Sequence, residues 1–260
     1  MKTIKLYFRF LAVHLKTAMA YKGSFILSCI GQLLITTNVF LGVKFLLDRF
    51  GSVGGYRLPE LTLCYSVILL SCSLAECFGR GFDAFPRILS SAQFDRILVR
   101  PRGIVFQILC QDMKPSVISR AAQAIVMLVY GITAGAVQWT IGKAMTLAAM
   151  VLCGSVLFFG LFLLYAALCF FTMEGLEVMN IFTDGAREYG KYPFGIYGKG
   201  VLLITTLIVP LALVQYWPLQ YLLDRGPWQY GLLPLLSLLF LIPVCSFWKF
   251  GVAHYRSTGS

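Results

Sequence analysis

The chain has 260 residues, of which 58% are hydrophobic and only 13% are charged. A soluble globular chain averages about 45–50% apolar and about 25% charged residues. These proportions exclude an ordinary soluble domain, a disordered chain and a nucleic-acid-binding domain, although the formal net charge is +11. The cations lie in short segments between long apolar runs, which is typical of a polytopic helical membrane protein with one membrane domain.

The N-terminal segment predicts a basic amphipathic helix. Lys2, Lys5, Arg9 and Lys16 fall in one narrow sector of a helical wheel, and apolar side chains fill much of the rest. Such a helix is suited to the headgroup layer of a membrane, so residues 1–23 are predicted to be an interfacial helix. The alternative is an irregular basic tail.

Six apolar runs are each long enough to cross about 30 Å of hydrocarbon, which takes about 20 residues. We predict an all-α polytopic fold whose permease domain covers 24–249, followed by a cytoplasmic tail at 250–260. Pro210 and Pro218 interrupt the end of the fifth run. The predicted spans lie near 24–47, 59–78, 116–137, 144–171, 200–216 and 231–249.

The distribution of Lys and Arg predicts that both termini face the cytoplasm, because cytoplasmic segments carry the excess of these residues. Only five of the 22 cations fall on the other side of the predicted topology: Lys44, Arg49, Arg57, Lys143 and Arg225. The remaining cations lie in the N-terminal segment, in the two long connections near 79–115 and 172–199, and at the C-terminus. Arg120, at the start of the third predicted span, is counted with the first of these connections.

The connection at 79–109 contains a short amphipathic stretch, in which apolar residues from Ile88 to Leu98 alternate with polar and charged ones. It ends at Arg100-Pro101, because proline disfavours helix in the residue before it. A helix of this kind can dock into a groove on a partner protein. The alternative is an interfacial helix that touches only lipid.

The connection at 173–200 combines four acids with three cations and is divided into turns by glycines and Pro193. Its tyrosines favour the membrane interface. The other interpretation of its charges is a salt-bridge cluster that closes a loop against the bundle. Nearer the C-terminus, the proline-rich segment 209–231 predicts a re-entrant or interfacial hairpin, and the alternative is an aromatic belt around an ordinary loop.

Individual residues within the spans predict contacts between side chains or helices rather than catalysis or ion transport. Glu76 can pair with Arg80 one helical turn later. Gly131 and Gly135 form a small-xxx-small pattern that favours close helix contact. Charges are missing from the middle of every predicted span, which argues against an ion-driven carrier or a charge-lined pore.

Motifs for catalysis or metal binding are missing from the sequence. It contains no P-loop, HExxH or GxSxG pattern. The eight cysteines include no CxxC pair, and the two histidines lie at opposite ends of the chain. No cofactor, metal site or catalytic residue is therefore predicted in this chain.

Three motifs resemble those of the ABC-2 type exporter permeases, and most closely a bacterial branch of uncharacterised permeases. The first is FDRILVRP at 94–101, followed by Phe106-Gln107. The second is REYGKYP at 187–193, followed by Ile196-Tyr197. The third is Pro210 with YWP at 216–218 and Leu222-Leu223. The resemblance covers nearly the whole chain.

The resemblance implies the type-2 ABC exporter permease fold and a half-transporter. Two permease chains, identical or different, would form the translocation pathway in the bacterial inner membrane. Two separate ATP-binding subunits would hold ATP and Mg²⁺ and drive it, so this chain would not itself be an enzyme. Membrane lipid is the other expected contact, and nucleic acid is not expected.

The resemblance also assigns roles to two groups of residues. A cytoplasmic coupling helix near 88–99 would be pressed into a groove of the ATPase through Ile88, Leu89, Phe94, Asp95, Arg96, Ile97, Leu98, Arg100 and Pro101. A cytoplasmic gate would comprise Glu174, Glu177, Arg187, Glu188, Tyr189, Gly190, Tyr192, Pro193 and Tyr197.

Two other classes of function compete with this interpretation: a self-sufficient carrier or channel, and a scaffold subunit that transports nothing. The sequence does not identify the substrate, although apolar spans suit a hydrophobic or amphipathic one.

Overall fold

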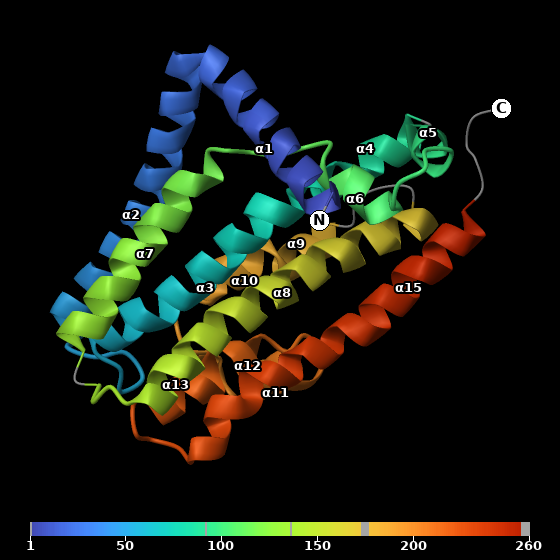
Figure 1. Cartoon of the computed structure of the whole chain (residues 1–260). Helices are drawn as coiled ribbons and strands as arrows, with labels where there is room; N and C mark the ends of the chain where they lie inside the picture. The colour runs from blue at the N-terminus through green and yellow to red at the C-terminus, as the bar shows by residue number, and fades with distance from the viewer. Residues whose placement is uncertain (1, 92, 136, 173–176, 256–260) are drawn as a thin grey trace.

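The structure is a computed structural model that describes residues 2–91, 93–135, 137–172 and 177–255; for 2–4 and 177–179 it describes the backbone only. Helices make up the described part of the chain, apart from turns and one isolated antiparallel bridge between Val53 and Tyr56. Figure 1 shows the helices as an inclined bundle. The long ones are α1 (Lys2–Ala20), α2 (Lys22–Phe50), α3 (Leu58–Gly79), α7 (Val117–Ala134), α8 (Ile141–Thr172) and α15 (Leu241–His254).

Short helices connect the long ones. Between α3 and α7 they are η1 (Arg80–Ala84), α4 (Phe85–Ser90), α5 (Gln93–Leu98) and α6 (Ile104–Leu109). Between α8 and α15 they are α9 (Glu177–Phe182), α10 (Asp184–Tyr189), η2 (Phe194–Tyr197), α11 (Lys199–Leu207), α12 (Leu211–Val214), α13 (Tyr216–Leu222), η3 (Trp228–Leu232), α14 (Leu233–Leu236) and η4 (Ser237–Phe240).

Five helical stretches of the described chain are long and apolar enough to cross a membrane: 22–50, 58–90, 117–134, 141–172 and 228–254. They coincide with five of the six predicted spans. The sixth prediction, near 200–216, falls on a pair of helices, 199–207 and 211–222, bent by 87°. The total is six spans only if this bent pair counts as one.

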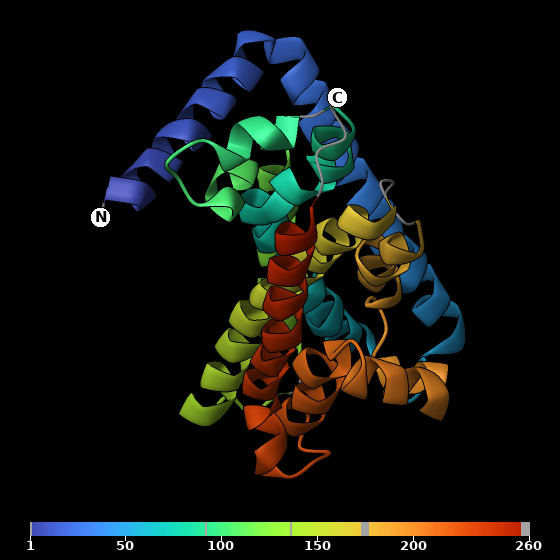
Figure 2. The ribbon, with the colours of Figure 1, turned by 90° about the vertical axis from the view of Figure 1, so that its right-hand side faces the viewer.

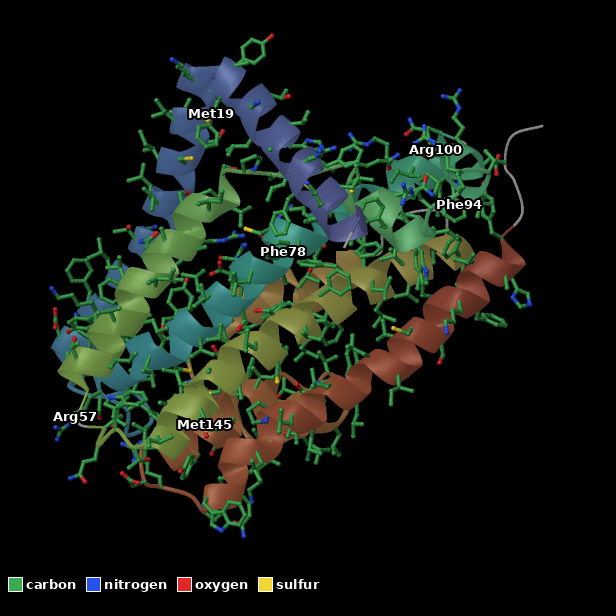
Figure 3. The ribbon with its side chains drawn as sticks, viewed as in Figure 1. Met19, Arg57, Phe78, Phe94, Arg100 and Met145 are labelled. Carbon is green, nitrogen blue, oxygen red and sulfur yellow. The ribbon has the colours of Figure 1, made fainter. Side chains whose placement is uncertain are left out.

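The bundle has two ends, which we name after their helices. The α4 end carries α4, α5 and α6, and the α13 end carries the turn at 51–57 and helix α13 (Figure 1). In Figure 3, Phe94 and Arg100 mark the α4 end, whereas Arg57 and Met145 mark the α13 end.

Helix α3 is the innermost helix of the bundle, with most of its side chains buried between α7 and α8. Small residues make this packing close. A Cβ on Gly131 would lie 3.0 Å from Leu63 Cα of α3, and one on Gly154 would lie 2.6 Å from Ser71 Oγ. Gly135, by contrast, caps the C-terminal end of α7, and the three atoms nearest to a Cβ there belong to Gly131 and Val137. Of the two glycines in the pattern, Gly131 is the one whose nearest atoms belong to another helix.

Helices α1 and α2 form an angled arm on the bundle (Figure 2). The structure has a helix over Lys2–Ala20, as the sequence predicts. Tyr7 Oη donates a hydrogen bond to the Phe78 carbonyl oxygen at 3.2 Å, and His14 Nε2 lies 3.0 Å from the Cys110 carbonyl oxygen. These contacts hold α1 against the α4 end. Most of α2 is exposed, which suits a helix that faces lipid.

An aromatic cluster fixes α4 and α5 to the rest of the bundle. Phe85 and Phe94 pack against Phe170 of α8 and against Trp248 and Tyr255 at the C-terminal end. The ring centroids are 4.8–5.5 Å apart. Each such pair contributes about 0.5–1.5 kcal/mol beyond the burial of its area. The α4–α5 unit is thereby tied to α8 and α15.

The segment from α10 to η2 runs along α3 from one end to the other. Arg187 lies near Glu76, and a Cβ on Gly190 would lie 2.8 Å from Ile68 Cγ2. A Cβ on Gly54, at the α13 end, would lie 2.8 Å from Ile196 Cγ1. The sequence predicts a connection here, and one interpretation of its charges is a salt-bridge cluster that closes the loop against the bundle. The structure agrees with that interpretation and lays the segment against α3, because Gly190 has no side chain to keep the two backbones apart.

The bend between α11 and α12 has a local cause. Helix α11 ends at Leu207, and Pro210 has no backbone N–H with which to continue the hydrogen-bond ladder. The fully buried Gln215 then joins the bent pair to the turn after α10. Its Nε2 donates to the carbonyl oxygens of Gly190 at 2.7 Å and Tyr192 at 3.1 Å, and its Oε1 accepts from Phe194 N at 3.3 Å.

Candidate functional site

The carboxylate of Glu76 is the centre of a buried ion cluster. Glu76 occupies the last turn of α3 and is 2% exposed. The Arg80 guanidinium approaches its Oε1 at 3.0 Å, and the Arg187 guanidinium approaches the same oxygen at 3.8 Å. Arg120 forms an ion pair with the other oxygen, Oε2. The predicted Glu76–Arg80 pair is therefore confirmed, and two further arginines share the carboxylate.

Arg120 joins three helices at this cluster. It lies in the first turn of α7, and its Nε donates to Ser73 Oγ of α3 at 3.2 Å. Its Nη1 donates to Gln32 Oε1 of α2 at 3.4 Å. The charge pattern of the sequence predicts Arg120 as a charge of the cytoplasmic connection, at the start of a helix. It is buried instead, because Glu76 compensates its charge across the α3–α7 contact.

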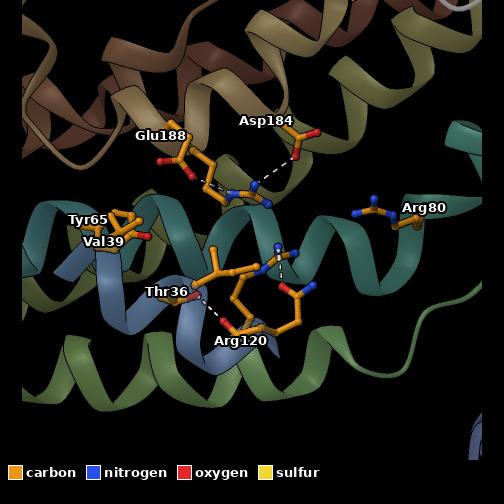
Figure 4. A pocket seen from close by; sticks show the side chains of 10 residues that line it. Thr36, Val39, Tyr65, Arg80, Arg120, Asp184 and Glu188 are labelled. Carbon is orange, nitrogen blue, oxygen red and sulfur yellow. Dashed lines mark hydrogen bonds and ion pairs between the residues drawn. The ribbon is translucent and has the colours of Figure 1, made fainter. Parts of the chain in front are cut away.

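Arg187 joins the cluster from α10, where it also contacts two acids at the solvent side. Its Nη2 lies 3.3 Å from Asp184 Oδ1, and its Nε lies 3.8 Å from Glu188 Oε1 (Figure 4). On the other side, Arg80 pairs with Asp83 at 3.0 Å. The cluster therefore links α2, α3, α7 and α10 at one level of the bundle.

Two polar cavities flank the cluster. One, of about 170 Å³, lies between α2, α3, α7 and α10 and is lined by Arg80, Arg120 and Arg187 among others; we call it the arginine cavity. The second, of about 230 Å³, lies towards α8 and α9 and is lined by Glu76, Asp83 and Asp184 among others. Space large enough for small polar groups therefore reaches the buried charges.

Several predicted gate residues belong to this region. Arg187 and Glu188 join the ion cluster. Tyr197 Oη donates to the Tyr189 carbonyl oxygen at 2.8 Å, and the two rings meet edge to face at 6.1 Å. The carbonyl oxygens of Gly190 and Tyr192 accept hydrogen bonds from Gln215, and Pro193 precedes η2. Glu174 lies outside the described residues, and only the backbone of Glu177 is described.

The predicted coupling stretch is divided into α4 and α5, and its apolar face points inward. Ile88, Leu89, Phe94 and Ile97 are all buried within the chain. The expectation that these four side chains face a partner protein is therefore wrong, because the aromatic cluster and α8 already cover them.

The outward surface of this region is basic, with one apolar pair. Leu98 is 42% exposed and Val99 is 83% exposed. Arg96, Arg100 and Pro101 are exposed next to them, and Asp95 is half-buried. We call the segment Leu98–Arg102 the exposed tip. It is the part of the predicted coupling stretch that a partner protein could reach.

Two ion pairs secure the α13 end. Lys143 Nζ lies 2.7 Å from Asp224 Oδ2, and Arg225 Nη2 lies 2.9 Å from Glu60 Oε1. The Arg225 guanidinium also lies over the Tyr56 ring, 4.9 Å from its centroid. Burial raises the pKa of the Tyr56 hydroxyl above its usual value. These contacts tie the hairpin after α13 to α3 and α8.

The comparison with protein families decides the identity of the chain. Residues 33–259 match the profile of the ABC-2 family transporter proteins. The chain belongs to the ABC-2 transporter family. No curated protein and no solved structure matched it.

Membership of the ABC-2 family identifies the chain as a multi-pass transporter membrane component. Such components typically lack an ATP site, and ATP-binding partner subunits are implied. In this ABC-2 protein, sequence reasoning missed the roles of Arg120, Gln32 and Gln215. The sequence did show a cation at the start of an apolar run and glutamines within such runs. These features indicate buried polar contacts, but they do not identify the residues that make them.

Proposed function

We propose that this chain is the permease subunit of an ATP-driven ABC exporter. Two permease chains, identical or different, form the pathway, and two separate ATP-binding subunits supply the energy. Both termini and the α4 end face the cytoplasm of a bacterium, and the chain spans its inner membrane. The family match over residues 33–259 carries this proposal, and the excess of Lys and Arg at the α4 end supports the orientation.

The exposed tip is the proposed contact with the ATP-binding subunit. Val99 supplies an apolar anchor, and Arg96, Arg100 and Arg102 surround it with positive charge. An apolar anchor with a charged rim suits a groove with an acidic border on a partner protein. ATP and Mg²⁺ belong to that partner.

The aromatic cluster is the proposed mechanical link between the tip and the spans. Phe94 packs against Phe170 of α8, and Phe85 packs against Trp248 of α15. Closely packed interiors transmit displacement rather than absorb it. A push on the exposed tip therefore reaches α8 and α15 through side-chain contacts.

The ion cluster is the proposed cytoplasmic gate. Glu76 holds α7 through Arg120 and α10 through Arg187. Glu76 contacts three arginines, and its 3.8 Å contact with Arg187 is the longest and weakest of these. This contact therefore separates first when α3 moves relative to α10. The gate then opens beside the arginine cavity.

A site-specific photo-cross-linking experiment tests the tip. A photoreactive amino acid replaces Val99 in one preparation and Val126 of α7 in the matched control, since both valines are exposed. We expect the adduct at 99 to capture an ATP-binding subunit in native membranes and the adduct at 126 to capture none. Equal capture by both would contradict the assignment of this contact to the tip. Capture by neither would contradict the coupling assignment and favour a self-sufficient carrier or a scaffold subunit.

A further inference from the structure

The arginine cavity combines features that suit an anionic ligand. It is lined by three arginines, Arg80, Arg120 and Arg187, and by the two acids that contact Arg187, Asp184 and Glu188, together with the polar side chains of Gln32, Thr36 and Tyr65. Figure 4 shows these side chains coming from α2, α3, α7 and α10. At about 170 Å³ the cavity has room for several water molecules, and therefore for a phosphate or carboxylate group.

The charges around this cavity are unevenly buried. The three arginine side chains are 5–21% exposed and converge on one buried carboxylate, that of Glu76. The remaining acids of the cluster are more exposed. Asp83, which pairs with Arg80, is 35% exposed, and Asp184 and Glu188, which both contact Arg187, are 57% and 44% exposed. Solvent screens the charges of exposed acids, so the inner part of the cluster retains an excess of positive charge.

The contacts of Arg187 with the two exposed acids are long. They measure 3.3 Å to Asp184 and 3.8 Å to Glu188, whereas a charge-assisted N–H···O bond is about 2.7–2.9 Å. Both carboxylates can rotate into solvent at little cost, since exposed ion pairs are weak. An incoming anion can therefore replace them on the guanidinium with shorter, bidentate bonds.

The other wall of the cavity is apolar. Ile35 and Val39 of α2 line it beside the polar groups. Ile35 is also 59% exposed on the lipid-facing surface of α2. A molecule whose charged group enters the cavity can therefore lay an attached hydrocarbon chain against α2, without leaving the apolar environment.

We propose that the arginine cavity binds the phosphate or carboxylate head group of an amphipathic anion, with its hydrocarbon chain against Ile35 and Val39 of α2. This assigns a substrate class to the proposed exporter. The statement that this anion is transported rests on the proposed exporter function, whereas the statement that the cavity binds it does not.

Equilibrium binding of radiolabelled decyl phosphate tests the proposal. The full chain, with whatever subunits co-purify, is placed in nanodiscs of phosphatidylcholine, and nanodiscs without protein give the background partition. We expect saturable binding that unlabelled decyl phosphate displaces and decyltrimethylammonium does not. Non-saturable binding, or equal displacement by the cation, would overturn the proposal.

Two further competitors identify the source of the anion. Displacement by phosphatidylglycerol in the nanodisc assigns the cavity to a membrane lipid head group. Resistance to that lipid assigns it to a free amphiphile. Inorganic phosphate is expected to compete at least tenfold more weakly than decyl phosphate, because it lacks the hydrocarbon chain. Equal competition would contradict the role of α2.

Two independent variants locate the binding in the cavity. Arg187→Gln should weaken binding at least tenfold, and Arg187→Lys should restore most of it, since lysine keeps the positive charge. Arg49→Gln, at an exposed position outside both the cavity and the exposed tip, is the matched control and should bind as the wild type does. Unchanged binding by Arg187→Gln would overturn the proposal.

The second variant leaves every charge in place. Thr36→Leu fills the cavity with apolar atoms and should also weaken binding at least tenfold, whereas Thr37→Leu, at the exposed neighbouring position, should not. If Arg187→Gln does not fold, the comparison of Thr36→Leu with Thr37→Leu tests whether the anion binds in the cavity. Capture of an ATP-binding subunit is measured separately, so loss of the anion site and loss of the exporter assignment are distinguishable.

Discussion

Replacing Glu76 by glutamine should destabilise the fold strongly. The substitution keeps the size and shape of the side chain but removes the charge on which three guanidiniums converge. Arg120, which is buried, then loses its ion partner. Removing one partner of a buried ion pair costs about 3–5 kcal/mol, because the other charge stays buried without compensation.

The matched control is Glu188→Gln. Glu188 also contacts one of the three arginines, but at 3.8 Å and with 44% of its side chain exposed. An exposed pair contributes about 0–1 kcal/mol. The two variants make the same chemical change within one cluster, so their difference isolates the effect of burial.

The assay is equilibrium unfolding of the purified chain in mixed micelles as the fraction of a denaturing detergent rises. We expect Glu76→Gln to lower the free energy of unfolding by about 3–5 kcal/mol and Glu188→Gln by less than about 1 kcal/mol. In a double-mutant cycle, Glu76→Gln and Arg120→Gln should be strongly non-additive. Equal destabilisation by Glu76→Gln and Glu188→Gln, or additivity in the cycle, would refute the reasoning.

The same unfolding assay checks two further predictions. Phe94→Ala should lower the free energy of unfolding by about 3–5 kcal/mol, because it empties the centre of the aromatic cluster. Val99→Ala should leave it almost unchanged, since Val99 is exposed. Similar losses in the two variants would contradict the inward orientation of α5. Gln215→Leu should lower the free energy of unfolding by at least about 2 kcal/mol. It leaves the carbonyl oxygens of Gly190 and Tyr192 and the N–H of Phe194 buried without this partner. Gln111→Leu, at an exposed position, is its control, and equal stability of these two variants would contradict the role of Gln215.

The helical class and most spans were predictable from the sequence because hydrocarbon imposes a simple rule. A helix that crosses a membrane needs a long apolar run, and the runs near 59–78 and 144–171 agree with α3 and α8 to within a few residues. The Glu76–Arg80 pair was predictable for a similar reason, since both residues lie on one helix at a fixed spacing.

Contacts between distant segments were not predictable in this way. Arg120 and Arg187 reach Glu76 from other helices, and periodicity says nothing about which helices are neighbours. A salt-bridge cluster that closes the loop against the bundle was one interpretation of the charges in this segment, but the sequence did not indicate that 184–197 runs along α3. Three of its backbone polar groups pair with Gln215, a partner more than 20 residues away in the sequence.

The orientation of the amphipathic stretch was also beyond the sequence. An apolar face can cover its own bundle or a partner, and the alternation around Phe94 is the same in both cases. The aromatic rings of Phe170 and Trp248 decide between them, and these residues lie far along the chain. The exposed Val99 and its arginine neighbours are accessible to a partner.

The central claim is that this chain works with separate ATP-binding subunits. The most direct measurement is purification of the tagged chain from native membranes in mild detergent, followed by mass spectrometry and an ATPase assay on the purified material. The account predicts a co-purifying P-loop ATPase and nucleotide hydrolysis. Recovery of the chain alone, without hydrolysis, would contradict it.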